Sequence, residues 1–294
     1  MFQSRRTVIA GLSAALLLAG IAASPASAQQ LKEVRIGFQK AGIFPVVKQR
    51  GTIENALKSR GITVKWVEFQ FGPPILEAIN TGNVDFGYTG DAPPIFAQAA
   101  RANLLYVAAV PSEGYNQAIV VPDASPIKTL ADLKGLKIRM IGNPLFIDTM
   151  NALGGNGVAL GFDQVFSSMQ TGVIDGAENN PPSFVAQNHN QVAKYFTMTE
   201  HLIIPELLVF SRISWNKLTP ADQALVTKFA KEAQAEQRVL WYAAEKTALD
   251  KMKEVGTDVV TSIDKTPFRD AVKPVWDKYG AKYAEMTKRI AAVS

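Results

Sequence analysis

Residues 81–96 read TGNVDFGYTGDAPPIF, and residues 171–184 repeat the same pattern as TGVIDGAENNPPSF. In each copy, Thr-Gly leads through an apolar residue and an aspartate to a polar loop, a proline pair and an aromatic side chain. The glycine fits the end of a helix, the Val-Asp and Ile-Asp segments read as short strands, and proline is tolerated in a helix's first turn. The repeat predicts two similar α/β lobes, each presenting a loop and a helix N-terminus to one cleft. Chance similarity of Gly- and Pro-rich segments is the alternative.

The N-terminal residues have the pattern of a secretory signal peptide. Arg5 and Arg6 precede an uncharged apolar run at 8–23, and a small-residue cleavage site ends at Ala28. The run is short for a bilayer span, although a retained anchor is the alternative. We therefore expect a periplasmic protein that begins at Gln29 after cleavage.

Composition narrows the class of function. The 294 residues include no cysteine, which excludes disulfides and thiolate chemistry, and 31 basic against 26 acidic residues show no basic cluster for nucleic acid. His189 and His201 lack metal-ligand spacing, and no nucleotide-binding or hydrolase motif occurs. The sequence therefore predicts no enzyme activity, no cofactor and no nucleic-acid partner. An enzyme on the same fold stays as a remote alternative.

Strand and helix patterns alternate along most of the chain. Strand patterns lie at 33–38, 63–69, 104–110, 118–121, 137–140 and 203–210, and helical patterns at 46–59, 73–80, 146–152 and 162–170. This alternation predicts βαβ units and mostly parallel sheets.

The longest expected element is a helix over residues 220–255. Thr219 is its candidate N-cap, Pro220 fits the first helical position, and Gly256 ends it. At 1.5 Å per residue the helix would be about 50 Å long, so we expect it to span both lobes. A break near Trp241 is the alternative.

Several residues fit the recognition of an anion. The loops at 89–91 and 178–180 precede helix N-termini, whose free N–H groups bind anions. Because the arrangement occurs twice we favour anion binding, and ordinary capping by Asp91 and Asn180 is the alternative. Arg139 stands alone on an apolar strand, where its guanidinium can clamp a carboxylate or form a structural ion pair. Gln39 follows the first strand, at the end where α/β sheets bind ligands.

The first part of the chain, residues 34–137, resembles the aliphatic-sulfonate-binding proteins of ABC importers. The resemblance rests on RIGFQK at 35–40, WVEF at 66–69, AINTG at 78–82 and TGDAPPIFAQAA at 89–100. It implies an ABC permease as partner and a sulfonate site lined by Gln39, Thr89, Gly90 and Asp91.

From residue 130 to 294 the chain resembles the DctP-type solute receptors of TRAP transporters. The resemblance rests on GLKIR at 135–139, QTGVIDGAENNP at 170–181, VAKY at 192–195 and LTPADQ at 218–223. It implies that Arg139 clamps a substrate carboxylate, and that Asn179 and Phe162 complete the pocket.

The two resemblances together predict a hybrid with an α/β, two-lobed periplasmic binding protein fold of type II-like topology, hinged between the lobes. We expect lobe 1 at residues 29–121 plus about 205–244, and lobe 2 at 122–204 plus about 245–294. The predicted function is capture of a small organic anion, with a carboxylate favoured, and delivery to a TRAP permease. A sulfonate delivered to an ABC permease is the alternative, and mismatched half-sites that bind nothing are another.

Overall fold

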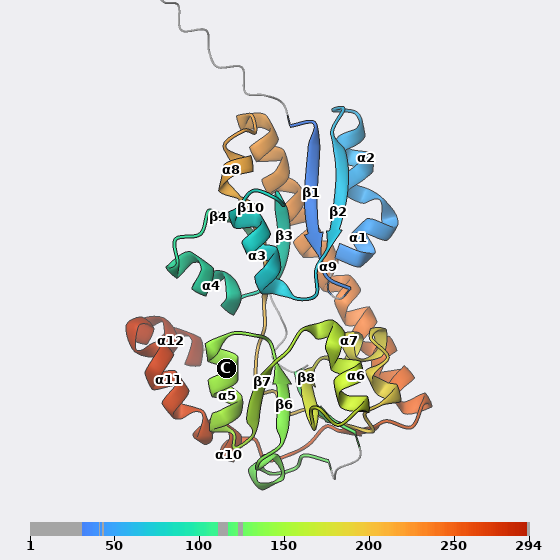
Figure 1. Ribbon diagram of the computed structural model, residues 1–294, viewed down its shortest axis with the longest axis vertical. Helices are drawn as coiled ribbons and strands as arrows, with labels where there is room; N and C mark the ends of the chain where they lie inside the picture. The colour runs from blue at the N-terminus through green and yellow to red at the C-terminus, as the bar shows by residue number, and fades with distance from the viewer. Residues whose placement is uncertain (1–30, 41, 43, 111–116, 123–125, 293–294) are drawn as a thin grey trace, which may run out of the picture.

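The computed structural model describes residues 31–292 except positions 41, 43, 111–116 and 123–125. The expected signal peptide and its cleavage site after Ala28 lie outside these residues. The chain forms two lobes, one above the other in Figure 1, and each lobe is built on one sheet. The predicted two-lobed α/β fold is confirmed.

The first sheet has five strands in the order β2-β1-β3-β10-β4, and the second has six in the order β11-β9-β5-β8-β6-β7. The first contains β1 (Glu33–Phe38), β2 (Thr63–Glu68), β3 (Phe86–Gly90), β4 (Leu104–Val110) and β10 (Glu206–Ser211). The second contains β5 (Ala118–Val121), β6 (Lys137–Met140), β7 (Asn156–Ala159), β8 (Gly176–Asn179), β9 (Tyr195–Thr197) and β11 (Asp258–Val260).

Helices cover both sheets. Those around the first sheet and along both lobes are α1 (Phe44–Arg50), α2 (Thr52–Lys58), α3 (Gly72–Asn80), α4 (Ala92–Ala99), α8 (Arg212–Trp215) and α9 (Pro220–Glu254). The second lobe adds α5 (Pro144–Ala152), α6 (Val165–Gln170), α7 (Pro181–Ala186), α10 (Thr266–Ala271), α11 (Lys273–Gly280) and α12 (Ala284–Ala291). Short 3₁₀ turns occur at η1 (Leu130–Leu133), η2 (Phe162–Gln164), η3 (His189–Gln191) and η4 (Ala281–Tyr283).

Two expected helices are interrupted. The segment 46–59 divides into α1 and α2 because Gly51 takes the left-handed conformation, with φ 62°. The segment 162–170 begins as the 3₁₀ turn η2 before it continues as α6. In the first case glycine supplies a backbone angle that other residues adopt only at a cost, so the helix turns a corner there.

The sheets are mixed: among the described residues five strand pairs are parallel and four antiparallel, so the predicted parallel pairing holds by a small majority. β1 pairs in parallel with β2 and β3, but β10 lies antiparallel between β3 and β4. In the second sheet, β5 lies antiparallel between β8 and β9. Both antiparallel strands enter their sheet directly after the chain has come from the other lobe.

The pairing of β5 also corrects the expected lobe boundary. A boundary after residue 121 assigns Ala118–Val121 to the first lobe, whereas this strand pairs with β8 and β9 of the second sheet. We propose that the second lobe begins by Gln117 and that the remaining expected boundaries, near 205 and 245, stand.

The helix α9 is 35 residues long and continues through Trp241 without a break. The Thr219 hydroxyl accepts a hydrogen bond from the Asp222 N–H at 3.2 Å, which caps the start of the helix as expected. The helix contacts β4 in the first sheet and β11 in the second. Figure 1 shows it passing alongside both lobes.

The two copies of the repeat fold alike. Gly82 and Gly172 follow α3 and α6 with φ 72° and 71°, so both end a helix in the left-handed conformation. Each copy then enters a strand, β3 or β8, and a helix, α4 or α7. The strands begin one residue after the aspartate, at Phe86 and Gly176, so the expected Val-Asp and Ile-Asp strands are wrong.

The aspartates of the repeat join each copy to a neighbouring strand. The Asp85 carboxylate accepts the Arg35 N–H at 2.7 Å, and the Asp175 carboxylate accepts the Lys137 N–H at 2.8 Å. In return, the N–H of each aspartate donates to the carbonyl of the same strand residue at 2.8 Å. These reciprocal pairs fix the start of β3 against β1 and of β8 against β6.

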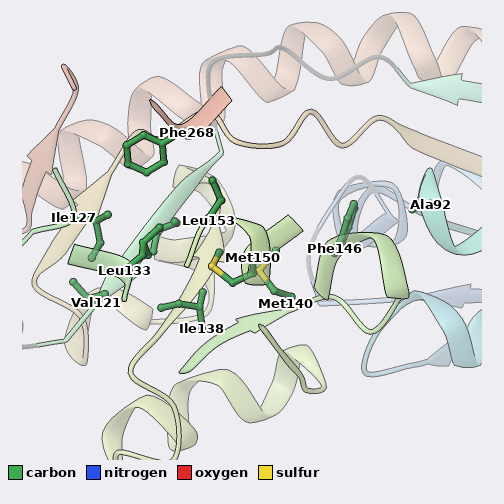
Figure 2. Packing of buried hydrophobic residues seen from close by; sticks show 11 residues of the cluster. Ala92, Val121, Ile127, Leu133, Ile138, Met140, Phe146, Met150, Leu153 and Phe268 are labelled. Atoms are coloured by element: carbon green, nitrogen blue, oxygen red, sulfur yellow. The ribbon is translucent and has the colours of Figure 1, made fainter. Parts of the chain in front are cut away.

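The apolar core of the second lobe reaches the first lobe. Ile138, Met140, Phe146 and Met150 pack in a buried cluster that also includes Ala92 at the start of α4 (Figure 2). The N-terminus of α4 is therefore packed against the second lobe. The contact brings the two lobes together beside the cleft.

Candidate functional site

A cavity lies between the two lobes, and the empty space there, with the open solvent at its mouth included, is about 1100 Å³. The first lobe contributes Gln39, Gly72, Tyr88, Thr89, Gly90, Val110 and Glu206 to its lining. The second contributes Arg139, Ile141, Phe162, Glu178, Asn179, Asn180 and Ser183, and α9 adds Gln237, Arg238, Trp241 and Tyr242. The structure thus brings six of the seven predicted site residues to one cavity.

Arg139 is the most constrained charged side chain at this cavity. It is only 2% exposed, and its Nε donates to the Leu160 carbonyl at 2.9 Å. Its Nη1 donates to the Glu178 carboxylate at 3.0 Å, and its guanidinium lies 5.3 Å from the ring centre of Phe162. Three contacts therefore fix the guanidinium before any ligand arrives. Both expectations for Arg139, an ion pair and a place at the cavity, fit the same side chain.

The Arg139–Glu178 pair lies almost entirely out of water. Burial lowers the pKa of Arg139 and raises that of Glu178, because each charged form loses hydration. The opposite charge of each partner acts against this shift. An ion pair so enclosed contributes little net stability, yet removing one partner leaves a buried charge uncompensated.

Asn179 is oriented by two hydrogen bonds. Its Oδ1 accepts the Asn180 N–H at 2.9 Å, and its Nδ2 lies 2.8 Å from Nδ1 of His189. Burial lowers the pKa of His189 to about 4, with the Arg139 charge adding to the shift, so the imidazole is neutral near pH 7. A neutral Nδ1 that accepts from Asn179 places the ring proton on Nε2. One N–H of the Asn179 amide is then left for the cavity.

Phe162 shares this support. Its ring meets the His189 ring edge-on at 5.5 Å between centroids, and Phe184 contacts His189 at 6.4 Å. His189 is 1% exposed and packs behind two predicted site residues. Its contacts with both side chains make His189 a positioning residue.

Three uncharged residues predicted for the site, Gln39, Thr89 and Gly90, line the cavity from the first lobe. Thr89 is buried at 1% exposure, and Gly72 approaches it so closely that a Cβ at Gly72 would lie 1.9 Å from the Thr89 hydroxyl. Gln39 and Gly90 also line the cavity, as expected.

Asp91 does not line the cavity. Its carboxylate accepts the Ala92 N–H at 2.8 Å, and burial raises its pKa. The alternative of ordinary capping therefore fits Asp91 better than ligand contact. Asn180 likewise caps α7 through the Ser183 N–H at 3.0 Å, although it still lines the cavity.

Sequence reasoning missed Glu206 and the residues from α9. Burial raises the pKa of Glu206 to about 7. A carboxylate directly after Pro205, at the start of an apolar strand, was the available signal. The residues of α9 follow helical spacing, Gln237 with Trp241 and Arg238 with Tyr242, but their face could not be known before the packing was known.

The described residues contain no group of three or more His, Cys, Asp or Glu side chains that could hold a metal ion. Within the same residues, no helix is both long and apolar enough to cross a membrane. A cavity that closes between two lobes on a fixed arginine defines the class of the protein as a receptor for a small solute.

The chain belongs to bacterial extracellular solute-binding protein family 7, the DctP family, whose model matches residues 97–282. A solute-binding protein of Chromohalobacter salexigens is 30% identical over 249 residues, covering 80% of this chain and 73% of the relative. These matches confirm the predicted TRAP resemblance, and the family match begins upstream of the expected residue 130.

Solved structures agree. A TRAP periplasmic solute-binding protein from Pseudomonas putida F1, with bound D-glucuronate, has a TM-score of 0.79 at 36% identity, over 89% of this chain and 97% of that one. One from Citrobacter koseri with bound D-glucuronate has a TM-score of 0.80 at 31% identity, over 90% and 100%. Its apo, open structure has a TM-score of 0.71, over 88% and 98%. The present structure is thus more similar to the ligand-bound form.

The sulfonate resemblance also has a counterpart. A putative aliphatic sulfonates-binding protein of Escherichia coli K12 is 49% identical over 106 residues, which cover 36% of this chain and 33% of the relative. This match is higher in identity but far shorter than the family 7 matches. The predicted mixture of two resemblances is confirmed, with the family 7 part dominant.

Proposed function

We propose that the protein captures a carboxylate-bearing solute between its lobes in the periplasm and delivers it to a TRAP permease. The observation that carries the proposal is Arg139, a buried guanidinium fixed at the cavity by Leu160, Glu178 and Phe162. A guanidinium that is already held in place loses little freedom when it binds a carboxylate by a charge-assisted hydrogen bond. Hexuronates bound to the similar structures support a sugar acid as the solute.

The Glu178 carboxylate does not exclude a second anion at Arg139. Glu178 takes Nη1 and Leu160 takes Nε, and no described residue bonds to Nη2. A ligand carboxylate would therefore approach through Nη2 with the free Asn179 N–H beside it. In this proposal Glu178 aims the guanidinium, and the ligand completes its hydrogen bonding.

The first lobe closes over the bound solute. Gln39, Thr89 and Gly90 would contact it with uncharged groups, while Trp241 of α9 covers it with an aromatic ring. Closure is a population shift that ligand contacts to both lobes favour. A hydrogen bond from Gln187 of α7 to the Lys40 carbonyl, 3.2 Å long, already joins the lobes at the rim.

Calorimetric titration with D-glucuronate, D-galacturonate and hexane-1-sulfonate tests the ligand class. We expect the two hexuronates to bind and Arg139→Lys to weaken them by at least tenfold, because lysine is a point charge without the planar fork. Arg35→Lys is the matched control, since Arg35 is an ion-paired strand arginine that does not line the cavity. Binding of the sulfonate alone, unaffected by Arg139→Lys, would favour the ABC alternative that the 106-residue match supports.

Export is part of the same proposal. The pattern that ends at Ala28 supports a cleaved signal peptide. Expression of the full chain, followed by N-terminal sequencing of the periplasmic fraction, should give a protein that begins at Gln29. Retention in the membrane fraction with an intact N-terminus would contradict it.

A further inference from the structure

Glu206 is a carboxyl group built into the first-lobe wall of the cavity. It is the first residue of β10 and pairs with Gly90 on one side and Val110 on the other. All three residues line the cavity, on the opposite lobe from Arg139. Tyr88 lies close enough that the Glu206 charge adds to the rise of its pKa, which burial already raises.

One oxygen of the Glu206 carboxyl group lacks the partner that an enclosed acid normally has. Its Oε2 is enclosed and has no hydrogen bond from any residue that the structure describes. The ion pairs of the described residues do not include it either, whereas Glu178 across the cavity is paired with Arg139. A buried polar atom without a partner is costly, and a cavity wall is where a ligand can supply one.

We propose that Glu206 is a specificity residue that accepts a hydrogen bond from a hydroxyl group of the solute, so that the receptor selects hydroxylated carboxylates over unsubstituted ones. The inference rests on the proposed function, since Arg139 holds the carboxylate end. An acid on the first lobe repels the carboxylate of the solute, and the arginine on the second attracts it. The solute is thereby oriented with its hydroxyl groups toward β10.

The burial of Glu206 is a second observation that supports this role. The pKa of Glu206 is raised to about 7 by loss of hydration, so the group carries less charge at neutral pH than an exposed glutamate. A carboxyl near neutrality can accept from a hydroxyl in one form and also donate in the other. Either form recognises a hydroxyl group, and neither is satisfied by a methylene group.

The test compares D-glucuronate with cyclohexanecarboxylate, a six-membered-ring acid without hydroxyl groups, by calorimetry on the mature protein and on Glu206→Leu. We expect Glu206→Leu to weaken D-glucuronate by about tenfold to a hundredfold, the effect of losing a hydrogen bond to a charged or acidic group. The affinity for cyclohexanecarboxylate should stay the same or rise. Glu206→Gln, which keeps an acceptor oxygen, should retain more D-glucuronate binding than Glu206→Leu.

Glu232→Gln is the matched control, because Glu232 is an exposed glutamate on α9 that forms an ion pair with Lys228. Equal weakening of both ligands by Glu206→Leu, or no change in their ratio, would reject the role of Glu206 while the carboxylate function stands. If the wild-type protein binds neither acid, the proposed function itself fails and this inference with it. A melting temperature of unliganded Glu206→Leu at or above wild type is expected, since the variant removes an unpartnered buried acid.

Discussion

In each lobe the strand that carries the repeat, β3 or β8, pairs with a neighbouring strand, β1 or β6. At the same position of that neighbour the first lobe has Gly37 and the second has Arg139. The two positions are equivalent by register, because Gly37 pairs with Gly87 one residue after the start of β3, and Arg139 pairs with Ala177 one residue after the start of β8. A Cβ at Gly37 would meet Ile75, Phe69 and Val84 within 3.3 Å, so this lobe has no room for a side chain there.

The next positions of the two copies differ in the same way. Tyr88 and Thr89 of β3 occupy the places of Glu178 and Asn179 in β8. The backbone scaffold is therefore shared, while the charged chemistry for a carboxylate lies in the second lobe. Two copies of the same strand and helix N-terminus therefore do not imply two equivalent anion sites.

Breaking the Arg139–Glu178 ion pair at the cavity should have the largest effect. Arg139→Met should lower the free energy of unfolding by about 3 kcal/mol, because it leaves Glu178 buried without its partner. It should also abolish binding of D-glucuronate. Chemical denaturation and calorimetry measure the two effects.

The double variant Arg139→Met/Glu178→Leu separates the two roles of the arginine. It should recover most of the stability, since no buried charge remains, but no ligand affinity. Recovered binding in the double variant would show that Arg139 is only a structural partner of Glu178.

Asp85 and Asp175 occupy equivalent positions in the two copies of the repeat but differ in their side-chain partners. Asp85 is 1% exposed and bonds to Arg35 and to the Ser214 hydroxyl, while Asp175 bonds through its side chain to the Lys137 N–H. Asp85→Ala should cost about 3 kcal/mol and Asp175→Ala about 1 kcal/mol in denaturant unfolding. Equal costs would mean that the shared backbone pair, rather than burial, sets the contribution.

Acid should destabilise the second lobe through its histidine. Burial lowers the pKa of His189 to about 4, and that of His201 in the following connection also to about 4. The unfolded chain takes up these protons near pH 6.5 and the folded chain only near 4, so stability is lost as pH falls through this window. The expected loss is about 1.4 kcal/mol per pH unit for each histidine.

Unfolding in urea between pH 7 and pH 5 measures this slope. His189→Gln should lower the slope by about 1.4 kcal/mol per pH unit, while Glu206, whose pKa is raised to about 7, gains stability over the same window and offsets His201. An unchanged slope in that variant would assign the acid sensitivity to other groups.

The smallest effect is expected at Gly82 and Gly172, which end the equivalent helices α3 and α6. Gly82→Ala and Gly172→Ala each force alanine into the left-handed conformation at φ near 70°, which costs about 1 kcal/mol. An added Cβ meets only ordinary contact at Gly82 and open space at Gly172. We therefore expect equal losses of melting temperature, and a clear difference would show that the two helix ends are not equivalent.

Local patterns predicted much of this architecture because the repeat, the strands and α9 are encoded in neighbouring residues. The pairing of β10 between β3 and β4 was not predictable, since its partners lie 96 to 124 residues away in sequence. The division of α1 from α2 at Gly51 was missed because glycine inside a helical pattern does not always break it.

The site was predicted where a residue's type and its position in a strand decided the outcome, as for Arg139 and Asn179. It was not predicted where packing between distant elements decided it. Ala92 packs on the second lobe and Asp91 turns to its own helix, while Glu206 reaches the cavity only because β10 is inserted beside β3.

The reciprocal hydrogen bonds of Asp85 and Asp175 have a consequence for how such receptors evolve. Each aspartate completes its main-chain bonds with a strand of its own lobe, Arg35 in one case and Lys137 in the other. The strand that carries each copy of the repeat is therefore held by main-chain bonds that do not depend on the sequence of the other lobe. The strand β10 comes from the family 7 part of the chain and pairs with β3, which comes from the sulfonate-receptor-like part. It does so through backbone hydrogen bonds, which do not depend on the side chains of either strand. This architecture is therefore compatible with a chain in which a sulfonate-receptor-like sequence continues into a family 7 sequence.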